Sequence, residues 1–263
     1  MSTPVLRVPD LRYGEVPGYR PLELDLYLPR ADGSAPVIVY VHGGGWRLGS
    51  RREPLPVLGA DFYESLAAQG FAVAAIDYRL SGEARFPAPL EDVRTAIGWV
   101  RDHAAWYGLD AGRVFGWGDS AGGHLVLLAA LTGAKVQGAV AWFPVTDLVG
   151  LPSDVEAAGG VPDAGPGSRE AQLLGAPAGS APDLARQASP VTHASAAAPP
   201  ILLMHGAADD MVPPAQSIRL AERLRAAGAA VELDLVPGAT HMWNGAGDVA
   251  AIVRRSVEFL RGR

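Results

Sequence analysis

The sequence predicts an α/β fold in which about eight strands form one mostly parallel sheet, with helices packed on both faces. Two observations lead to this prediction. From residue 36 onward, short apolar runs alternate with stretches of helical periodicity. Most of these runs are apolar at every position, which is typical of strands that are covered by helices on both sides. The 263 residues, 49% of them hydrophobic, suit a single domain over 1–263.

The strands and helices are expected in a regular order. A hairpin comes first, because LELDLYLP (22–29) alternates with period two and follows an extended segment near 11–15. The later strands are predicted at 37–42, 71–77, 114–118, 136–143, 201–206 and 231–236. The helices are predicted at 62–69, 90–106, 120–131, 215–227 and 248–260.

Residues 148–198 interrupt this order. The segment is rich in Gly, Pro, Ala and Ser, and it contains one helical patch near Arg169 to Leu174. A segment of this length without regular structure, inside a compact domain, usually serves as a binding loop or a lid. We therefore expect a lid-like, substrate-binding insert rather than a second domain.

Composition and charge exclude several classes of protein. The formal net charge of -6 argues against a nucleic-acid partner, because phosphate binding needs clustered Lys and Arg. The one compact basic run, Arg47 to Arg52, is interpreted as a solvated loop. The absence of cysteine excludes disulfides and thiolate chemistry. No leader peptide and no membrane-spanning stretch is recognisable, so a cytoplasmic location without a membrane partner is expected.

The segment GWGDSAGGHL (116–125) is the first candidate for chemistry. Gly118, Ser120 and Gly122 fit the pattern G-x-S-x-G, with a predicted strand before it and a predicted helix after it. The residue at the apex of such a turn has a strained backbone, and its neighbours two positions away must be almost bare. The turn presents the Ser120 hydroxyl at a helix N-terminus, which favours negative charge. Ser120 is therefore the candidate nucleophile.

A second glycine-rich motif, HGGGW (42–46), directly follows a predicted strand. Glycine lets backbone N–H groups approach a ligand closely. Such donors stabilise the oxyanion that develops during acyl transfer. The amides of Gly43, Gly44 and Ala121 are predicted to form this oxyanion hole.

A nucleophilic serine needs a base. His241, in PGATHMW, follows the last predicted strand and is the only histidine after the acid-bearing HGAADDMVP (205–213), which gives the chain order Ser, Asp, His. The loop around it can bring the imidazole back over the strand ends. The remaining histidines are assigned to bracing, packing or loop-stabilising roles, although one in the insert could touch substrate (His193): His42, His103, His124, His193 and His205.

The base needs an orienting acid, and three aspartates compete for this role. Asp209 lies four residues past a predicted strand end, in a loop that should face the site. Asp210 would point away or cap the following helix. Asp147 also follows a predicted strand and could reach the same imidazole. Asp209 is favoured.

Taken together, these motifs resemble the α/β-hydrolase superfamily. More narrowly, HGGGW, DYRL (77–80), FPAPLEDV (86–93), GDSAGG and HGAADDMVP resemble the hormone-sensitive-lipase-like and BD-FAE-type bacterial esterases. SPVTHAS (189–195), followed by PPILLMHG, strengthens the second comparison. The resemblance implies that four residues are a scaffold that braces the oxyanion loop: Asp77, Tyr78, Arg79 and Asp92.

One departure from the hormone-sensitive-lipase-like pattern concerns the amino terminus. Those enzymes usually carry a long helical cap before the first strands, whereas this sheet is expected to begin within the first thirty residues. Any lid must therefore come mainly from residues 148–198.

The resulting hypothesis is a serine carboxylesterase that acts on short-chain or aryl esters through an acyl-enzyme, with no metal or organic cofactor. Four residues beside the motifs are candidate pocket walls, although each could equally be a core residue: Trp46, Met211, Met242 and Trp243. Two alternatives remain open, an amide hydrolase of the arylformamidase type and a binding protein on a hydrolase scaffold. The sequence also leaves homodimer formation open.

Overall fold

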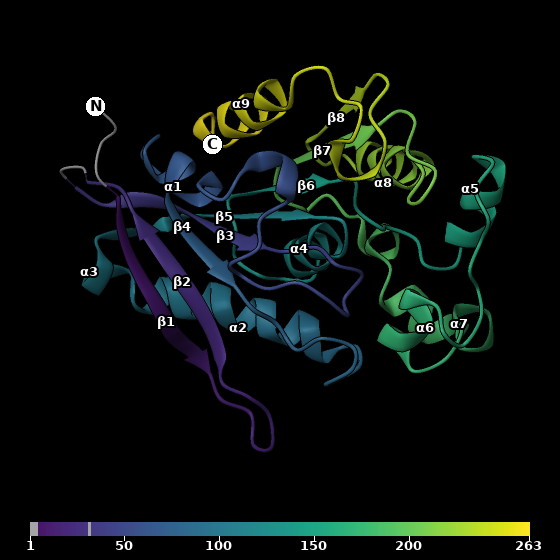
Figure 1. Cartoon of the computed structure of the whole chain (residues 1–263), viewed down its shortest axis with the longest axis horizontal. Coiled ribbons are helices and arrows are strands. Elements are labelled where there is room, and N and C mark those ends of the chain that lie inside the picture. The colour runs from purple at the N-terminus through teal and green to yellow at the C-terminus, as the bar shows by residue number, and fades with distance from the viewer. Residues whose placement is uncertain (1–4, 31–32) are drawn as a thin grey trace.

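A computed structural model describes residues 5–30 and 33–263. These residues form one sheet of eight strands in the order β1-β2-β4-β3-β5-β6-β7-β8, as Figure 1 shows. The strands are β1 (Leu6–Gly14), β2 (Leu22–Leu28), β3 (Ala35–Val41), β4 (Ala72–Ile76), β5 (Leu109–Asp119), β6 (Gly138–Trp142), β7 (Ile201–Gly206) and β8 (Val231–Val236). β2 pairs antiparallel with both β1 and β4, and all pairs from β4 to β8 are parallel. The predicted fold class is confirmed.

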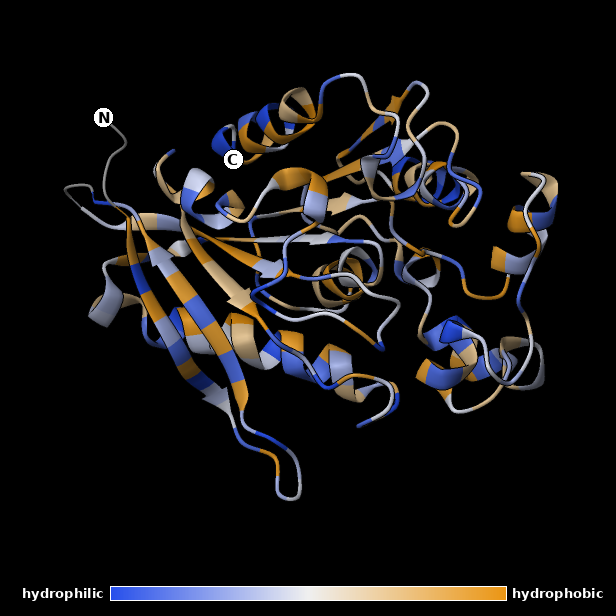
Figure 2. Ribbon diagram, viewed as in Figure 1, coloured by the Kyte–Doolittle hydropathy of each residue, from blue (hydrophilic) through white to orange (hydrophobic). Residues whose placement is uncertain are grey.

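Helices cover both faces of the sheet. One face packs against α1 (Phe62–Ala67) and α9 (Val249–Arg261), and the other packs against α2 (Ala88–Asp102), α4 (Ala121–Leu131) and α8 (Ala215–Ala226). A short helix, α3 (Ala104–Tyr107), follows α2. Figure 2 shows that hydrophobic and hydrophilic residues alternate along β1 and β2, as expected for the edge of the sheet.

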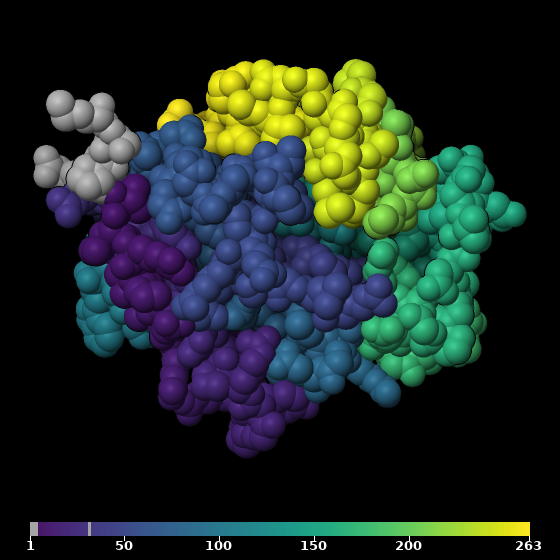
Figure 3. Space-filling model, viewed as in Figure 1, coloured from purple at the N-terminus to yellow at the C-terminus, as the bar shows by residue number. Residues whose placement is uncertain are grey.

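The insert at 148–198 contains three short helices beside the sheet. They are α5 (Leu151–Ala157), α6 (Arg169–Leu174) and α7 (Pro182–Gln187). Figure 3 shows the insert as one contiguous green flank of the molecule. Of the three helices, only α6 coincides with the helical patch expected from the sequence.

The element boundaries differ from the prediction where local geometry overrides periodicity. The helix predicted at 90–106 is broken at His103, whose backbone is not helical (φ -101°, ψ 6°), so that α2 and α3 are separate. The strand predicted at 114–118 extends back to Leu109, because its early part pairs with Ala35 of β3.

The basic run at 47–52 is exposed at Arg47 and Arg52, as expected for a solvated loop, but Arg51 departs from this prediction. Arg51 is buried, and its Nε donates to Asp25 at 2.8 Å while its backbone N–H donates to Asp77 at 2.7 Å. The same guanidinium contacts Asp10 and lies 3.1 Å from Glu23. These acids come from β1, β2 and the end of β4, so the arginine ties the loop after β3 to the hairpin edge of the sheet.

Candidate active site

Ser120 occupies the sharp turn between β5 and α4, with φ 50° and ψ -116°. A Cβ added to Gly118 would lie 2.5 Å from the backbone carbon of Gly122. A Cβ added to Gly122 would lie only 2.0 Å from the carbonyl oxygen of Val41. The bare positions therefore allow the start of α4 to approach both β5 and the end of β3. This contact places Ser120 beside the glycine-rich loop that follows β3.

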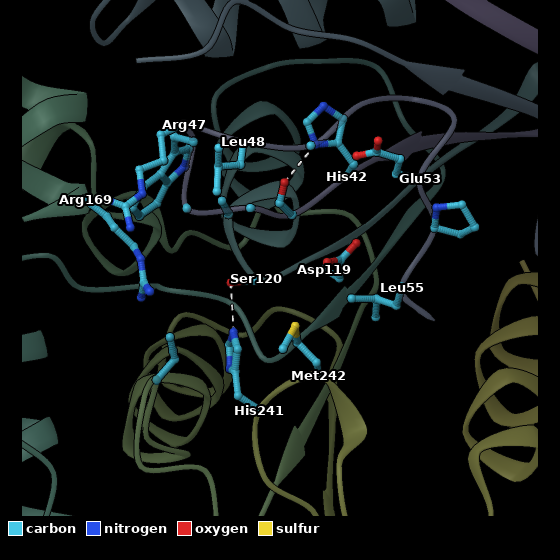
Figure 4. Close-up of a pocket in the computed structure, with 18 of the residues that line it drawn as sticks. His42, Arg47, Leu48, Glu53, Leu55, Asp119, Ser120, Arg169, His241 and Met242 are labelled. Carbon is cyan, nitrogen blue, oxygen red and sulfur yellow. Dashed lines mark hydrogen bonds between the residues drawn. The ribbon is translucent and has the colours of Figure 1, made fainter. Parts of the chain in front are cut away.

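The structure brings Ser120, His241 and Asp209 together from three separate loops. His241 Nε2 lies 3.1 Å from Ser120 Oγ, and His241 Nδ1 lies 2.7 Å from Asp209 Oδ2. Figure 4 shows the imidazole directed at the serine hydroxyl. Asp209 and His241 are buried, whereas Ser120 is half-buried. This is the geometry of a serine nucleophile with a base and an orienting acid.

Asp209 is held in place by its own loop. Its Oδ1 accepts hydrogen bonds from the backbone N–H groups of Met211 at 3.0 Å and Val212 at 2.9 Å. Burial disfavours the ionised carboxylate, but hydrogen bonds from His205 and His241 outweigh this effect and hold the pKa of Asp209 below its ordinary value. Asp209 is therefore anionic at neutral pH, as a partner of an imidazolium must be.

The two competing aspartates lie elsewhere. Asp210 is exposed. Asp147 forms an ion pair with Arg219 at 3.1 Å and accepts hydrogen bonds from the backbone N–H groups of Val149 and Gly150. Its carboxylate therefore stabilises the backbone at the beginning of the insert.

The glycine-rich loop presents its backbone amides near Ser120. Among the described residues, no hydrogen-bond acceptor is assigned to the amides of Gly44 and Ala121, whereas the Gly43 amide hydrogen-bonds to the Asp119 carboxylate. Gly44 has φ +108°, a conformation that L side chains rarely adopt, and a Cβ there would lie 2.2 Å from the carbonyl oxygen of Leu48. Free amides held by a rigid loop are suited to receive an oxyanion.

Sequence reasoning missed a role for Asp119, the residue before the nucleophile. Its buried Oδ1 accepts a hydrogen bond from the Tyr40 hydroxyl at 2.8 Å, and a Cβ at Gly43 would lie 2.3 Å from its Oδ2. Burial raises the pKa of Asp119 to about 6, against the hydrogen bonds from Tyr40 and the Gly43 backbone, which lower it. Asp119 thus positions Gly43 against the serine turn. The carboxylate in GDSAG was the available signal.

Two of the four residues expected to be a scaffold, Tyr78 and Asp77, contact the loop that follows β3. The Tyr78 hydroxyl donates to the His42 carbonyl at 3.2 Å, and its ring stacks on the His42 ring with centroids 4.5 Å apart. Asp77 accepts the backbone N–H of Arg51 in the same loop. Arg79 and Asp92 instead pair with each other, with Nη2 and Oδ1 at 2.6 Å.

His124 and His205 are both fully buried and fixed by hydrogen bonds. His124 Nδ1 accepts from Trp46 Nε1 at 3.1 Å, and its Nε2 donates to the Ala188 carbonyl at 2.7 Å. Burial lowers the pKa of His124 to about 4, which keeps the ring neutral. His205 lies 2.7 Å from both Ser217 Oγ and the Val212 carbonyl, so it fixes the loop that carries Asp209. The sequence did not predict that His205 would hold the loop of the orienting acid.

The remaining two histidines serve local structure. His103 stacks on Trp99, with ring centroids 4.2 Å apart. His193 Nε2 lies 2.8 Å from the Gln187 carbonyl oxygen, and the residue does not line the cavity described below.

A cavity of about 790 Å³ opens above Ser120 and His241. Three of the four candidate wall residues line it: Trp46, Met211 and Met242. The prediction for Trp243 is wrong. Its side chain is 1% exposed and packs in the core against Trp142 and Phe143, because its backbone turns it away from the cavity. The other lining residues come mainly from the loop after β3 and from α6, including Leu48, Leu55, Arg169 and Glu170.

Five non-glycine residues around the site have a positive φ. These are Trp46 (59°), Ser120 (50°), Phe143 (36°), Met242 (60°) and Trp243 (65°). The ring centroid of Phe143 lies 4.7 Å from that of His241 and 4.9 Å from that of Trp243. Phe143 and Trp243 thus pack in one aromatic cluster with the base. Such conformations are strained, and they persist only where the surrounding packing imposes them.

Neither a metal-binding cluster nor a membrane-spanning helix is present among the described residues. No group of three or more His, Cys, Asp or Glu side chains is arranged to hold a metal ion within residues 5–30 and 33–263. In the same part of the chain, no helix combines the length and the apolar character needed to cross a membrane. The cytoplasmic location and the homodimer both stay predictions.

The strand order and the strand-Ser120-helix turn define the class: this is an α/β-hydrolase fold. The chain belongs to the BD-FAE family, which matches residues 24–224. The resemblance predicted from the motifs is thereby confirmed.

Individual relatives agree with this assignment. Esterase LipQ of Mycobacterium tuberculosis is 34% identical, over 93% of this chain and 58% of that protein. A truncated carbohydrate esterase from gut microbiota superposes with a TM-score of 0.85 at 27% identity, over 99% of this chain and 97% of that one. Esterase Est2 of Thermogutta terrifontis gives 0.73 at 27%, over 96% and 89%, and has also been solved with propionate and with butyrate bound. The chain spans little more than half the length of the curated relatives it matches, 58% and 53% for the first two.

Proposed function

We propose that the protein is a carboxylesterase that hydrolyses short-chain or aryl esters through a Ser120 acyl-enzyme. The observation that carries this proposal is the chain of contacts from Ser120 Oγ to His241 at 3.1 Å and from His241 to Asp209 at 2.7 Å. The known relatives are named esterases, which favours an ester over an amide as the substrate.

In the proposed reaction, Ser120 Oγ attacks the ester carbonyl carbon while His241 Nε2 takes the serine proton. The negative charge that develops on the carbonyl oxygen is stabilised by the amides of Gly44 and Ala121, together with that of Gly43. Each such donor contributes roughly 10²- to 10³-fold in rate. Asp209 stabilises the imidazolium.

The tetrahedral intermediate then breaks its bond to the alcohol oxygen, which receives the proton from His241. Water attacks the resulting acyl-enzyme, with His241 again accepting a proton. A second tetrahedral intermediate releases the carboxylic acid and returns the proton to Ser120. Every proton is transferred through one imidazole, so no cofactor is required by this cycle.

The cavity supports the proposed substrate class. The leucine, proline and methionine side chains that line it give apolar walls beside Ser120, and its volume of about 790 Å³ suits a small ester. We also propose that residues 148–198 act as a substrate-binding insert, since Arg169 and Glu170 of α6 line the same cavity. The short-chain acids bound to Est2 agree with this choice.

The test is hydrolysis of p-nitrophenyl esters from acetate to long acyl chains by the native protein and by Ser120→Ala. We expect serine-dependent activity that is highest between acetate and hexanoate. Labelling by a fluorophosphonate, measured by mass spectrometry of intact protein, should be lost in the same variant. Hydrolysis by folded Ser120→Ala at near-native rates would refute the nucleophile, and a folded native protein that is neither active nor labelled would refute the proposed function.

A further inference from the structure

Two arginines line one side of the active-site cavity. Arg47 belongs to the loop after β3, and Arg169 is the first residue of α6 in the insert. Figure 4 shows both of them on one side of Ser120, with Glu53 on the other side. The cavity therefore has a cationic side that is formed by two separate parts of the chain.

Neither guanidinium forms an ion pair with the protein, although Arg169 interacts electrostatically with the Glu170 carboxylate over a longer distance. Among the described residues, no carboxylate oxygen lies within 4.0 Å of the side-chain nitrogens of Arg47 or Arg169. Many other arginines of the described residues do form ion pairs, as in the contact of Arg219 with Asp154 at 2.6 Å. Two like charges that face the same cavity repel each other, and an anion bound between them would remove this cost.

Arg169 is positioned by the glycine-rich loop. A Cβ added to Gly45 would lie 2.6 Å from Cδ and 3.2 Å from Nε of Arg169, so the arginine stem rests directly on the Gly45 backbone. The third glycine of HGGGW thus makes room for this side chain. Because Arg169 is half-buried in this contact, it loses less conformational freedom on binding than a fully solvated arginine would.

The arginines also lie where two cavities meet. A second cavity, of about 520 Å³, shares four lining residues with the first: Arg47, Arg169, Glu170 and Met211. A substrate group that extends from Ser120 toward the insert must therefore pass these guanidinium groups.

We infer that Arg47 and Arg169 bind a carboxylate of the substrate, so that the preferred substrates are esters that also carry one free carboxylate. This inference rests on the proposed esterase function. The planar fork of arginine matches a carboxylate with two parallel hydrogen bonds. Glu53 and Glu170 line the same cavity and would repel a doubly charged phosphate more strongly than a singly charged carboxylate.

The experiment compares kcat/KM for matched ester pairs. On the acyl side, p-nitrophenyl pentanoate is paired with the p-nitrophenyl monoester of glutaric acid. On the alcohol side, 4-methylphenyl acetate is paired with 4-acetoxybenzoate. Each pair is measured for the native protein, for Arg47→Met, Arg169→Met and their double variant, and for Arg225→Met, an exposed arginine outside both cavities, as the control.

In at least one pair, the ratio of kcat/KM for the anionic ester to that for the neutral ester should fall about two- to fivefold for each arginine removed, because partly exposed ion pairs contribute modestly. Arg169→Lys should retain part of the preference, and Arg225→Met all of it. The native preference should also weaken as salt is raised from about 0.01 to 1 M.

Three outcomes decide the question. A ratio in the double variant equal to the native one, in both pairs, overturns the inference. 4-Acetoxyphenyl phosphate is measured against 4-methylphenyl acetate as a third pair, and a fall in the ratio for this pair alone would assign the arginines to phosphate and overturn the choice of carboxylate. Failure to hydrolyse even the neutral esters would contradict the proposed function itself, which separates the two failures.

Discussion

Replacing Asp209 by asparagine should remove almost all activity, because the hydrogen bonds around this residue dictate how an amide must lie. Oδ1 accepts two backbone N–H groups, from Met211 at 3.0 Å and Val212 at 2.9 Å, so only the amide oxygen can occupy its place. The amide NH₂ is then directed at His241 Nδ1, which in the native protein lies 2.7 Å from a carboxylate oxygen.

An NH₂ group in this position selects the wrong tautomer of His241. The imidazole must accept at Nδ1 and therefore carries its proton on Nε2, where it can no longer take the proton of Ser120. The loss expected for a serine triad with this defect is about 10⁴-fold in kcat. This corresponds to about 5.4 kcal/mol of transition-state stabilisation.

The matched control is Asp210→Asn, which makes the same chemical change one residue away on an exposed side chain. Both variants are assayed by kcat and KM on p-nitrophenyl butyrate, with folding checked by circular dichroism. We expect Asp210→Asn to stay within about threefold of the native kcat. Equal losses in the two folded variants would refute the assignment of Asp209 as the orienting acid.

Three further predictions concern the framework of the site. Gly122→Ala would bring a Cβ to 2.0 Å from the last carbonyl oxygen of β3 and should lower the free energy of unfolding, measured by urea titration, by about 3 kcal/mol or more. At Gly98 an added Cβ would meet no atom within 4 Å beyond the adjacent backbone of its own helix, so Gly98→Ala should raise the free energy of unfolding by about 0.5 to 1 kcal/mol in the same titration. Because the pKa of Asp119 is raised from 3.8 to about 6, the contribution of this residue to stability is greatest below pH 3.8 and is lost as the pH rises through about 6. Relative to Asp119→Asn, the native protein should therefore lose about 3 kcal/mol between pH 3 and 8. Arg51→Met should cost about 1.5 to 3 kcal/mol, because Asp25 and Asp77 each lose a charged hydrogen bond while Asp25 keeps Arg7 and Arg52. Arg12→Met, which breaks an exposed pair, should cost less than about 1 kcal/mol by calorimetry.

Each of these predictions has a contrary result. Equal stability of the two glycine variants would show that the approach of α4 to β3 is loose. A pH-independent difference between the native protein and Asp119→Asn would mean that this carboxyl titrates as it does in the unfolded chain. A cost for Arg51→Met as small as that for Arg12→Met would mean that the buried acids find other partners.

Much of the fold could be predicted because its strands are short, apolar and bounded by turn residues. β7 and β8 coincide with the predicted 201–206 and 231–236. The helices α5 and α7 were not predicted, because each begins at or next to a proline in Gly-, Ala- and Pro-rich sequence and buries at most two side chains. α5 buries only Leu151 and Val155, and one such pair is too little to show a helical period.

Some residues of the candidate site could also be predicted from the sequence, and others could not. Ser120, His241 and Asp209 could be singled out because their local motifs follow predicted strands. The role of Asp119 depends on Tyr40, 79 residues away, and such contacts leave no local pattern. Trp243 was misplaced because proximity in sequence to His241 does not reveal which way a turn directs its side chains.

The strained backbone around the site affects how the protein loses activity on heating and how stable variants should be selected. Positive φ angles occur there at Trp46, Ser120, Phe143, Met242 and Trp243. Relaxation of any one of them would release strain while leaving every strand intact, so small opening fluctuations are concentrated at the site. The rate of ester hydrolysis should therefore respond to a loss of packing before the fold does. On gentle heating, this rate should fall while the far-ultraviolet circular dichroism spectrum is still native. Thermostable variants of this chain would accordingly be selected by residual activity after heating rather than by melting temperature alone.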